Sequence, residues 1–203
     1  AIESVPPGTM LHSGICESYA KGGEKTRHLP GVQVLAESGK AADPAHTQGR
    51  PALFGASAAA FLEQPGLHEE LFGPSSVLVE ARDQADLLRI AHSLEGQLTA
   101  TVHATEADLV EAAPLLHALE SKAGRLILNG FPTGVEVSPA MQHGGPYPAS
   151  TDSRFTAVGT AAIQRWARPV CFQNFPDTLL PEELRAANPL GLLRTVNGVT
   201  TRE

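Results

Sequence analysis

Apolar and polar residues follow two different rhythms in the middle of the chain. Residues 76–80 read Ser-Val-Leu-Val-Glu, a short run rich in β-branched residues that predicts a strand. Asp83 comes next and can cap a helix, because an apolar stripe at helical spacing follows it. The stripe consists of Leu87, Leu88, Ala91 and Leu94. Gly96 then stands where we expect the helix to end in the left-handed conformation.

The same succession repeats further along the chain. Residues 98–103 predict a second strand, and Thr105 with Asp108 three positions later resembles a capping box that opens a second helix. The apolar side of this helix carries Leu109, Ala112, Ala113, Leu116 and Leu119. We expect Gly124 to end it before a third strand at 125–129, whose consecutive apolar residues are typical of buried parallel strands. This order predicts an α/β fold, a mostly parallel sheet with flanking helices.

The flanks of this region are less regular. Residues 31–36 favour a strand, and residues 56–63 favour a helix that ends at the Pro-Gly pair behind them. The Gly- and Pro-rich segment 130–148 predicts a long loop, and loops of this length inside compact domains are usually functional or mobile. Residues 170–175 lean toward a further strand.

Bulk composition narrows the classes of function. The chain has 203 residues, of which 42% are apolar and 18% charged, as in ordinary globular proteins, and its apolar runs are too short to span a membrane. A net charge of −7 with only 15 Lys and Arg argues against nucleic acid as a partner. Cys16 and Cys171 form no paired-cysteine motif, and such unpaired thiols favour the cytoplasm. The eight histidines show no metal-ligand spacing, so we expect no metal site.

The most specific local feature is the run 69–74 (Glu-Glu-Leu-Phe-Gly-Pro), placed directly before the first predicted strand. Taken alone, it describes only an acidic helix end, an aromatic residue and a Gly-Pro reversal. Its setting makes it more specific, because it resembles the nicotinamide-contacting element of the aldehyde dehydrogenase superfamily and further stretches follow in that family's order. These stretches are Gly96–Val102, Arg125–Asn129 and Gly144–Gly145.

Several stretches are similar to one branch of that superfamily, which oxidises α-ketoglutarate semialdehyde (2,5-dioxovalerate) and related fatty aldehydes. They are Glu95–Thr101, Asn129–Val137, His143–Pro148 and the tail Arg168–Gln173. The resemblance extends from about Met10 to Gly198 and implies the C-terminal portion of such an enzyme. It assigns residues 1–165 to part of the catalytic domain and residues 166–203 to a C-terminal strand for oligomerisation and a tail.

The resemblance gives two residues of the 69–74 run a role toward NADP or NAD. Glu70 matches the carboxylate that accepts hydrogen bonds from the nicotinamide ribose hydroxyls, and an ionised carboxylate is an acceptor-only group suited to a diol. Phe72 matches the aromatic residue beside the nicotinamide ring, where a flat apolar face limits the tilt of the ring. The alternative for Phe72 is an ordinary core residue. By analogy, the branch leans towards NADP or the use of both cofactors. The residue that would decide between NAD and NADP lies in the domain that this chain lacks.

The resemblance also implies that the loop after Asn129 forms part of the aldehyde-binding funnel. This agrees with the general rule that ligands of α/β proteins bind at the carboxyl ends of strands. Phe131, Pro132 and His143 are the residues we expect to contact the aldehyde. His143 could equally be a solvent-exposed turn residue with no contact to the aldehyde. Asn129 itself is expected to be a structural hydrogen-bonding residue.

The resemblance also implies what this chain lacks. In the family, the cysteine nucleophile, the general base, the oxyanion amide and the Rossmann domain all precede the region that matches. Cys16 matches a later helix-forming segment and Cys171 the tail, so we expect no catalytic residue here and no turnover by this chain alone. As partners we expect the aldehyde and further copies of the chain in a homo-oligomer, through residues 167–175 as an edge strand.

Two other hypotheses remain at this point. A non-catalytic interaction module could have kept only the assembly surface of the family. The second hypothesis is an unrelated nucleotide-binding α/β domain. The chain contains neither G-x-G-x-x-G nor G-x-x-x-x-G-K-[ST], which argues against this hypothesis.

Overall fold

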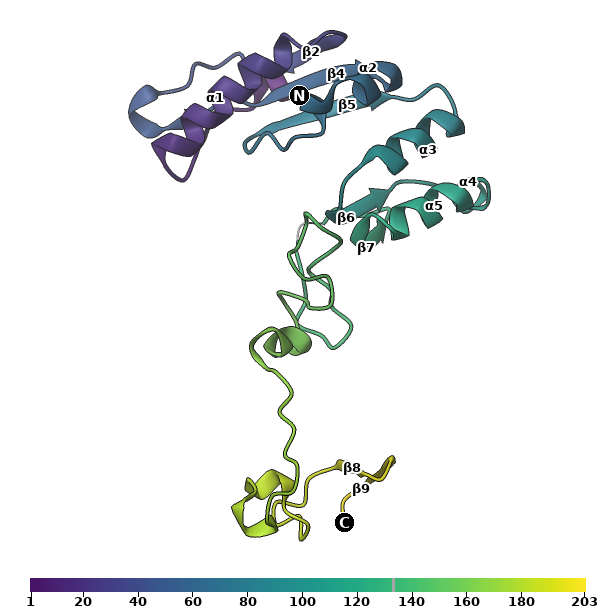
Figure 1. The fold of residues 1–203 in the computed structure, drawn as a ribbon. Coiled ribbons are helices and arrows are strands. Elements are labelled where there is room, and N and C mark those ends of the chain that lie inside the picture. Colours follow the sequence, from purple (N-terminus) through teal and green to yellow (C-terminus); the bar gives the residue numbers. More distant parts are fainter. Residues whose placement is uncertain (133) are drawn as a thin grey trace. The chain divides into compact units, whose positions relative to one another are not determined.

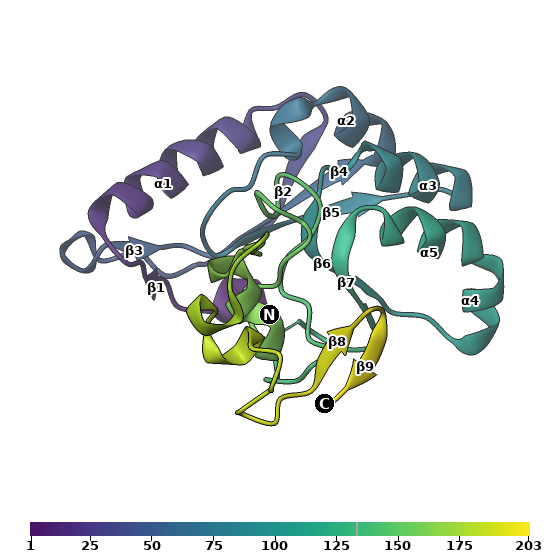
Figure 2. The same ribbon diagram turned by 60° about the horizontal axis from the view of Figure 1, so that its bottom comes forward.

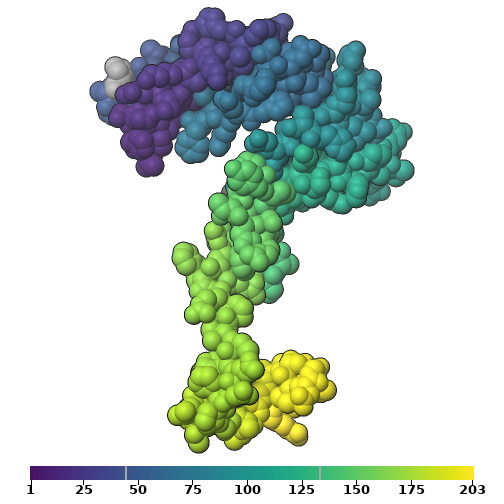
Figure 3. All heavy atoms as spheres, in the orientation of Figure 1, coloured from purple at the N-terminus to yellow at the C-terminus, as the bar shows by residue number. Residues whose placement is uncertain are grey.

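The computed structural model describes residues 1–132 and 134–203, apart from the side chain of residue 44. Thr133, which belongs to the loop expected to border the aldehyde, lies outside the described residues. The chain divides into two compact units, Ala1–Arg165 and Trp166–Glu203 (Figure 1). In the space-filling view of Figure 3, the atoms of the second unit are those coloured green to yellow.

The first unit holds five α-helices among the described residues, together with seven strands. The helices are α1 (Ser13–Arg27), α2 (Ala58–Glu63), α3 (Gln84–Ser93), α4 (Glu106–Glu111) and α5 (Ala113–Glu120). The strands are β1 (Gly8–Thr9), β2 (Val32–Glu37), β3 (Gln48–Gly49), β4 (Ala52–Ser57), β5 (Ser75–Glu80), β6 (Gln97–Val102) and β7 (Ala123–Leu128). Short 3-10 turns are η1 (Ile2–Ser4), η2 (Pro44–His46), η3 (Pro65–Leu67) and η4 (Thr160–Trp166), the last of which reaches one residue into the second unit.

The strands of the first unit form separate sheets. β4 lies at the centre of a three-stranded sheet, with β2 antiparallel on one side and β5 parallel on the other. β6 and β7 pair in parallel in a second sheet, and the short strands β1 and β3 pair in antiparallel. The α/β class is therefore confirmed, and one of the two expected crossovers, from β6 to β7, joins parallel neighbours. A single mostly parallel sheet is not formed over the described residues, because β5 and β6 do not pair.

Helices cover one face of the three-stranded sheet. In Figures 1 and 2, α1 and α2 lie along the same side of β2, β4 and β5. Phe54 of β4 is 1% exposed beneath them, and a cluster of Ala56, Phe61 and Leu67 continues the core toward α3. Burial of such side chains stabilises a fold by about 1.5–3 kcal/mol each. On the opposite face Leu78 is 57% exposed, so this face is left bare.

Most of the elements expected in the middle of the chain are confirmed. β5, α3, β6 and β7 occupy the predicted places within two residues. Asp83 caps α3 by accepting a hydrogen bond from the Asp86 main-chain N–H at 2.8 Å, and Thr105 and Asp108 form the predicted capping box. These signals depend on neighbours in sequence, which is why they could be found without the fold.

The roles expected for two glycines are wrong. α3 ends at an extended residue, and Gly96 is not among the described residues with positive φ. Gly124 lies inside β7 and ends no helix. A side chain has no room at either position, because main-chain oxygens from residues 144 and 146 pack against these glycines. The second predicted helix is also two helices, α4 and α5, because Pro114 starts a new helix at its first turn.

Two elements before the middle region were not foreseen in full. The helix expected at 56–63 starts only at Ala58, and the residues before it complete β4, the central strand. α1 spans 15 residues although it contains Gly22 and Gly23, which are unfavourable in helix interiors by about 0.5–1 kcal/mol each. Tertiary packing outweighs local propensity in both places.

The second unit has little regular structure. It contains the short turns η5 (Asp177–Leu179) and η6 (Glu182–Leu184) and a hairpin of β8 (Arg194–Val196) with β9 (Val199–Thr201). Buried Asn188 holds the hairpin: its amide donates to the carbonyl oxygens of Leu192 at 3.0 Å and Arg202 at 2.7 Å. Residues 167–175, expected to form a strand, are unpaired in this chain, and Phe175 is 53% exposed. No helix within the described part of the chain is long and apolar enough to cross a membrane.

Candidate cofactor and substrate site

The segment Glu69–Pro74 lies between η3 and β5 and borders an open cavity of about 520 Å³. The cavity is lined by Thr26, Phe54, Gly66, Leu67, Glu69, Glu70, Leu71, Phe72, Gly73, Ser75, Ser76 and Val77. Both residues expected to contact the cofactor, Glu70 and Phe72, therefore face the same hollow. Phe72 is 64% exposed, so the alternative that it is a core residue is wrong for this structure.

Alternate residues of this segment are anchored to α1. A Cβ on Gly22 would lie 2.5 Å from the Leu71 side chain, so Leu71 packs directly on the helix backbone. A Cβ on Gly73 would lie 2.2 Å from the ring of Tyr19, which stacks against that glycine in the same way. Successive side chains of an extended segment point to opposite sides. With Leu71 and Gly73 held inward, Glu70 and Phe72 are directed away from the helix.

The start of the segment is anchored to α2. The ring of His68 stacks on Phe61, with centroids 4.3 Å apart and planes inclined by 16°. The His68 Nε2 lies 2.9 Å from the Phe61 carbonyl oxygen. Glu69 adds an exposed ion pair with Lys25 of α1 at 3.3 Å, which is a weak contact at the surface. Glu70 accepts no hydrogen bond from the described residues, so both of its oxygens are available to a ligand.

Glu70 also borders a second, wide hollow of about 660 Å³. Its lining comprises His68, Glu69, Glu70, Glu95, Gly96, Gln97, Leu98, Thr99, Pro148 and Ala149. Three carboxylates line this hollow, and their negative charge repels phosphate and favours hydroxyl donors or a positively charged group. The charge of this hollow therefore suits a ribose and a cationic ring better than a pyrophosphate.

The loop that follows β7 reaches this second hollow by main-chain contacts. A Cβ on Gly124 would lie 2.0 Å from the Gly144 carbonyl oxygen, and one on Gly96 would lie 2.1 Å from the Pro146 oxygen. A Cβ on Gly145 would in turn lie 2.4 Å from the Gln97 oxygen. The turn 144–148 is thus pressed against the amino ends of β6 and β7, and Pro148 comes to line the same hollow as Glu70.

The three residues expected to contact the aldehyde are not brought together. Phe131 is 77% exposed beyond the carboxyl end of β7, where its ring lies 5.4 Å from that of His103, and Pro132 beside it is exposed. His143 is half-buried next to the turn at the amino ends of the strands. Its main-chain N–H donates to the Thr156 hydroxyl at 2.8 Å, which is more than a plain exposed turn would require.

Asn129 has the structural role expected of it. Its side chain accepts a hydrogen bond from the Ala104 main-chain N–H and donates one to the Ala104 carbonyl oxygen, both at 2.9 Å. Its φ is +51°, in the left-handed region that asparagine tolerates better than most residues. Asn129 therefore ties the carboxyl end of β7 to the segment behind β6.

Neither cysteine belongs to the candidate site. Cys16 lies in α1, as its helix-forming match predicts, and its thiol donates to the Gln48 carbonyl oxygen at 3.5 Å. Cys171 is exposed in the second unit. No group of acidic residues, histidines and cysteines that could hold a metal ion occurs among the described residues.

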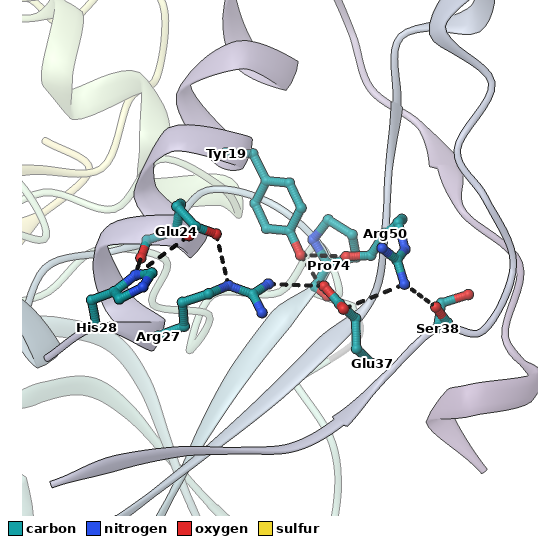
Figure 4. Close-up of polar contacts among 8 residues, drawn as sticks. All are labelled: Tyr19, Glu24, Arg27, His28, Glu37, Ser38, Arg50 and Pro74. Carbon is teal, nitrogen blue, oxygen red and sulfur yellow. Dashed lines mark hydrogen bonds and ion pairs between the residues drawn. The ribbon is translucent and has the colours of Figure 1, made fainter.

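Tyr19 supports the candidate site and was missed by the sequence analysis. Figure 4 shows its ring projecting from α1 toward Pro74 and Arg50. Its hydroxyl donates to the Arg50 carbonyl oxygen at 2.6 Å and lies 3.3 Å from the Pro74 carbonyl oxygen. Burial raises the pKa of the Tyr19 hydroxyl, so the group stays protonated and remains a donor. Gly22 in the middle of α1 was the one available sign of close packing at this place.

Comparisons with known proteins agree with the geometry. No protein-family model matches the chain. The chain is 47% identical over 198 residues to the alpha-ketoglutaric semialdehyde dehydrogenase 2 of Azospirillum brasilense, covering 98% of this chain and 37% of that protein. It is 48% identical over 197 residues to the alpha-ketoglutaric semialdehyde dehydrogenase of Acinetobacter baylyi, covering 97% of this chain and 37% of that protein. The chain thus spans little more than a third of the curated relatives it matches.

The fold matches solved structures as well. The Delta-pyrroline-5-carboxylate dehydrogenase of Mycobacterium tuberculosis, bound with NAD, superposes with a TM-score of 0.60 at 19% identity. The superposition covers 86% of this chain and 32% of that enzyme. Other solved structures of this fold are complexes with NADP.

The chain shares its fold with these solved dehydrogenases. The curated relatives confirm the resemblance to the C-terminal portion of aldehyde dehydrogenases. Within that class, the sequence is similar to the alpha-ketoglutaric semialdehyde dehydrogenases. This is the branch expected in the sequence analysis from Glu95–Thr101, Asn129–Val137, His143–Pro148 and Arg168–Gln173.

Proposed function

We propose that this chain works as part of an NAD(P)-dependent aldehyde dehydrogenase that oxidises α-ketoglutarate semialdehyde, or a related aldehyde, to the carboxylic acid. The observation that carries the proposal is the display of Glu70 and Phe72 on one open cavity by a segment whose other residues are anchored. Their order and setting resemble the family's nicotinamide-contacting element. Both curated relatives are named alpha-ketoglutaric semialdehyde dehydrogenases, which supports the proposed substrate.

The residues present fit the nicotinamide half of a dinucleotide. Glu70 has two free carboxylate oxygens for the two hydroxyls of a ribose, and Phe72 offers an exposed flat face beside them. Glu69 and Glu70 line the same cavity as Phe72, and their negative charge favours an oxidised nicotinamide, whose ring is cationic. When bound, the cofactor supplies the hydride acceptor, and holding its ring in one orientation is the part these residues perform.

The aldehyde is proposed to approach from the side of the turn 143–148. His143 directly precedes that turn, and Pro148 at the end of the turn lines the hollow that Glu70 also lines, which supports the proposal. Phe131 and Pro132 lie at the other end of β7. For them we propose an outer position on the substrate path.

The remaining chemistry is proposed to come from a longer polypeptide. Neither Cys16 nor Cys171 lies at the candidate site, so the nucleophilic cysteine, the general base and the Rossmann domain are assigned to the part of the relatives that this chain does not match. The unpaired edges of β5 and β6 and the bare face around Leu78 support this, because buried parallel sheets are normally covered on both faces.

The second unit is proposed to serve assembly into a homo-oligomer. Residues 167–175 carry exposed apolar side chains on unpaired backbone, as an edge strand that joins a neighbouring subunit would. The prediction of a cytoplasmic location stays a prediction. Self-association of the isolated chain is expected, and a clean monomer in sedimentation velocity would contradict it.

The proposal can be tested in a hybrid enzyme in which this chain replaces the matching 198 residues of the Azospirillum brasilense relative. We expect the hybrid to reduce NAD(P) in the presence of α-ketoglutarate semialdehyde, whereas this chain alone does not. Glu70→Gln removes the charge that two ribose hydroxyls would meet, and charge-assisted hydrogen bonds contribute about 1.5–3 kcal/mol. The expected rise in the KM for the cofactor is about 10- to 100-fold.

Glu17→Gln is the matched control, since it removes the same charge from an exposed position on α1. It should leave both kinetic constants unchanged. An active hybrid in which Glu70→Gln behaves like Glu17→Gln would overturn the cofactor role. An inactive but folded hybrid, together with a chain that self-associates, would favour the hypothesis of a non-catalytic interaction module.

A further inference from the structure

We infer that Tyr19 is a positioning residue for the cofactor: it clamps Gly73 and Pro74 so that Glu70 and Phe72 keep a fixed place on their cavity. The inference rests on the proposed function for its consequence, although the clamp itself is a property of this chain. No residue of α1 was expected to act on the site.

The first part of the clamp is steric. Tyr19 is 8% exposed, so its ring is held by its surroundings. Three ring carbons would lie 2.2–2.7 Å from a Cβ on Gly73, which means that the glycine backbone rests on the ring face. The same ring approaches Gly49 within 3.2 Å of a virtual Cβ. The ring is therefore packed between Gly73 and Gly49, which restricts its movement.

The second part of the clamp is polar. The Tyr19 hydroxyl has one proton, which it donates to the Arg50 carbonyl oxygen at 2.6 Å, with the Pro74 carbonyl oxygen near it at 3.3 Å. The Pro74 oxygen also accepts a hydrogen bond from the Ala52 main-chain N–H at 3.0 Å. This carbonyl group is thus fixed from the helix and from β4 at once, at the point where the segment enters β5.

The third part holds Tyr19's own partner in place. Figure 4 shows a chain of charged groups that runs from α1 to the segment before β4. Arg27 pairs with Glu24 at 2.9 Å and with Glu37 at 3.0 Å, and Glu37 also meets Arg50 at 3.3 Å. Arg50 further donates to the Ser38 carbonyl oxygen. Networks of this kind restrain their members more than single surface pairs do.

The consequence lies one residue away from the clamp. Gly73 and Pro74 follow Phe72 directly, so a shift of their backbone moves Phe72 and then Glu70. Displacements of about 1 Å in positioning elements can reduce turnover about a hundredfold. The buried Tyr19 hydroxyl, held by its acceptors, prevents such a shift of the backbone at Gly73 and Pro74 before any ligand binds.

The clamp can be tested on the 203-residue chain itself with Tyr19→Phe, which keeps the ring and removes the hydroxyl. We measure hydrogen–deuterium exchange of the Ala52 and Ser75 amides, which donate to the Pro74 and Gly73 carbonyl oxygens. Loss of a net hydrogen bond should speed their exchange roughly two- to tenfold, while the β6 and β7 amides in the same sample keep their rates. Unchanged rates at Ala52 and Ser75 would overturn the clamp.

Cys16→Ala is the matched control, because it removes a weak donor from the same helix one turn earlier. It should leave the Ala52 and Ser75 rates as they are. If it speeds them as much as Tyr19→Phe does, general loosening of α1 explains the result and the assignment to Tyr19 fails.

The hybrid enzyme then separates positioning from plain stability. Tyr19→Phe should raise the KM for NAD(P) two- to tenfold and lower kcat, with the KM for the aldehyde unchanged. A lower melting temperature with unchanged constants would mean that Tyr19 is only structural. Failure of the proposed function would give a different result, an active hybrid whose kinetic constants do not respond to Glu70→Gln. In that case the hydrogen–deuterium exchange experiment still shows whether Tyr19 holds Gly73 and Pro74.

Discussion

Two segments of this chain reach the same hollow, and they are held there by different means. Glu69–Pro74 is fixed by side chains: Leu71 packs on α1, Gly73 rests on a tyrosine ring, and His68 stacks on Phe61. The turn 144–148 is fixed by its own backbone, whose carbonyl oxygens touch glycines at the starts of β6 and β7. One segment uses rings and methyl groups, the other uses main-chain atoms.

The difference predicts how each segment tolerates change. A side chain can move to another rotamer or shift by a few tenths of an ångström when a neighbour grows. A main-chain carbonyl can move only if the whole loop moves with it. The backbone-held turn should therefore be the more sensitive of the two, although it has fewer hydrogen bonds to lose.

The largest effect is expected from Gly124→Ala. Its new methyl group would lie 2.0 Å from the Gly144 oxygen, so the turn must leave its place or β7 must bend. We expect a loss of about 3 kcal/mol in the free energy of unfolding, at the upper end of overpacking effects. Urea denaturation measures it. Gly134→Ala is the control in the same loop, because nothing lies within 4 Å of its Cβ, and it should change stability by less than about 0.5 kcal/mol.

A smaller effect is expected from Gly73→Ala. The new methyl group meets the Tyr19 ring at 2.2 Å, and that ring can yield in part, so the expected loss is about 2 kcal/mol. Gly23→Ala on α1 is the control: it has open space around its Cβ and should stabilise the chain by about 0.5–1 kcal/mol through helix propensity. A loss at position 73 that equals or exceeds the loss at position 124 would contradict the comparison.

The ion pairs of α3, which lies between the two segments in the sequence, should respond to acid. Asp86 of α3 is 1% exposed, and hydrogen bonds from Arg82, then Arg89, hold its pKa well below the usual range. Since the folded pKa is depressed, the carboxylate stabilises the fold above the unfolded value of about 3.9, and this contribution is lost as the pH falls through the folded pKa. Asp86→Asn should lower the urea midpoint at pH 7.

The difference in urea midpoint between Asp86→Asn and the unmodified chain should become steadily smaller when the pH is lowered below about 4. Urea midpoints between pH 2 and 7 measure it. A gap that stays constant over this range would show that the ion pairs of Asp86 contribute nothing, and that only its hydrogen-bond geometry matters. Asp108, whose pKa is lowered by its hydrogen bonds from Thr105, offers a second carboxylate for comparison.

The smallest effect on stability is expected from Phe72→Ala. Its ring is 64% exposed, so its loss should change the free energy of unfolding by less than about 0.5 kcal/mol. In the hybrid enzyme the same change should raise the KM for the cofactor. A loss of stability above about 1 kcal/mol would instead show that Phe72 belongs to the core, the alternative that this structure argues against.

Local signals in the sequence were reliable where neighbours along the chain make the contacts. The caps at Asp83 and Thr105 and the strand at 75–80 follow from residues at most a few positions apart. Signals failed where distant residues decide. β4 was missed because its alanine and glycine residues have low strand propensity, and it owes its place to burial between β2 and β5.

The sequence by itself determined the class of this protein, through the run Glu69–Pro74 and the stretches that follow it, and it singled out Glu70 and Phe72, which line one cavity in the structure. It could not show what holds them. Gly96 and Gly124 looked like helix ends and are contact points for a loop, and Tyr19 gave no signal although it holds Gly73 and Pro74. The physical reason is the same in each case. A close approach between two backbones, or between a ring and a backbone, exists only after folding has brought residues from 20 to more than 50 positions apart into van der Waals contact.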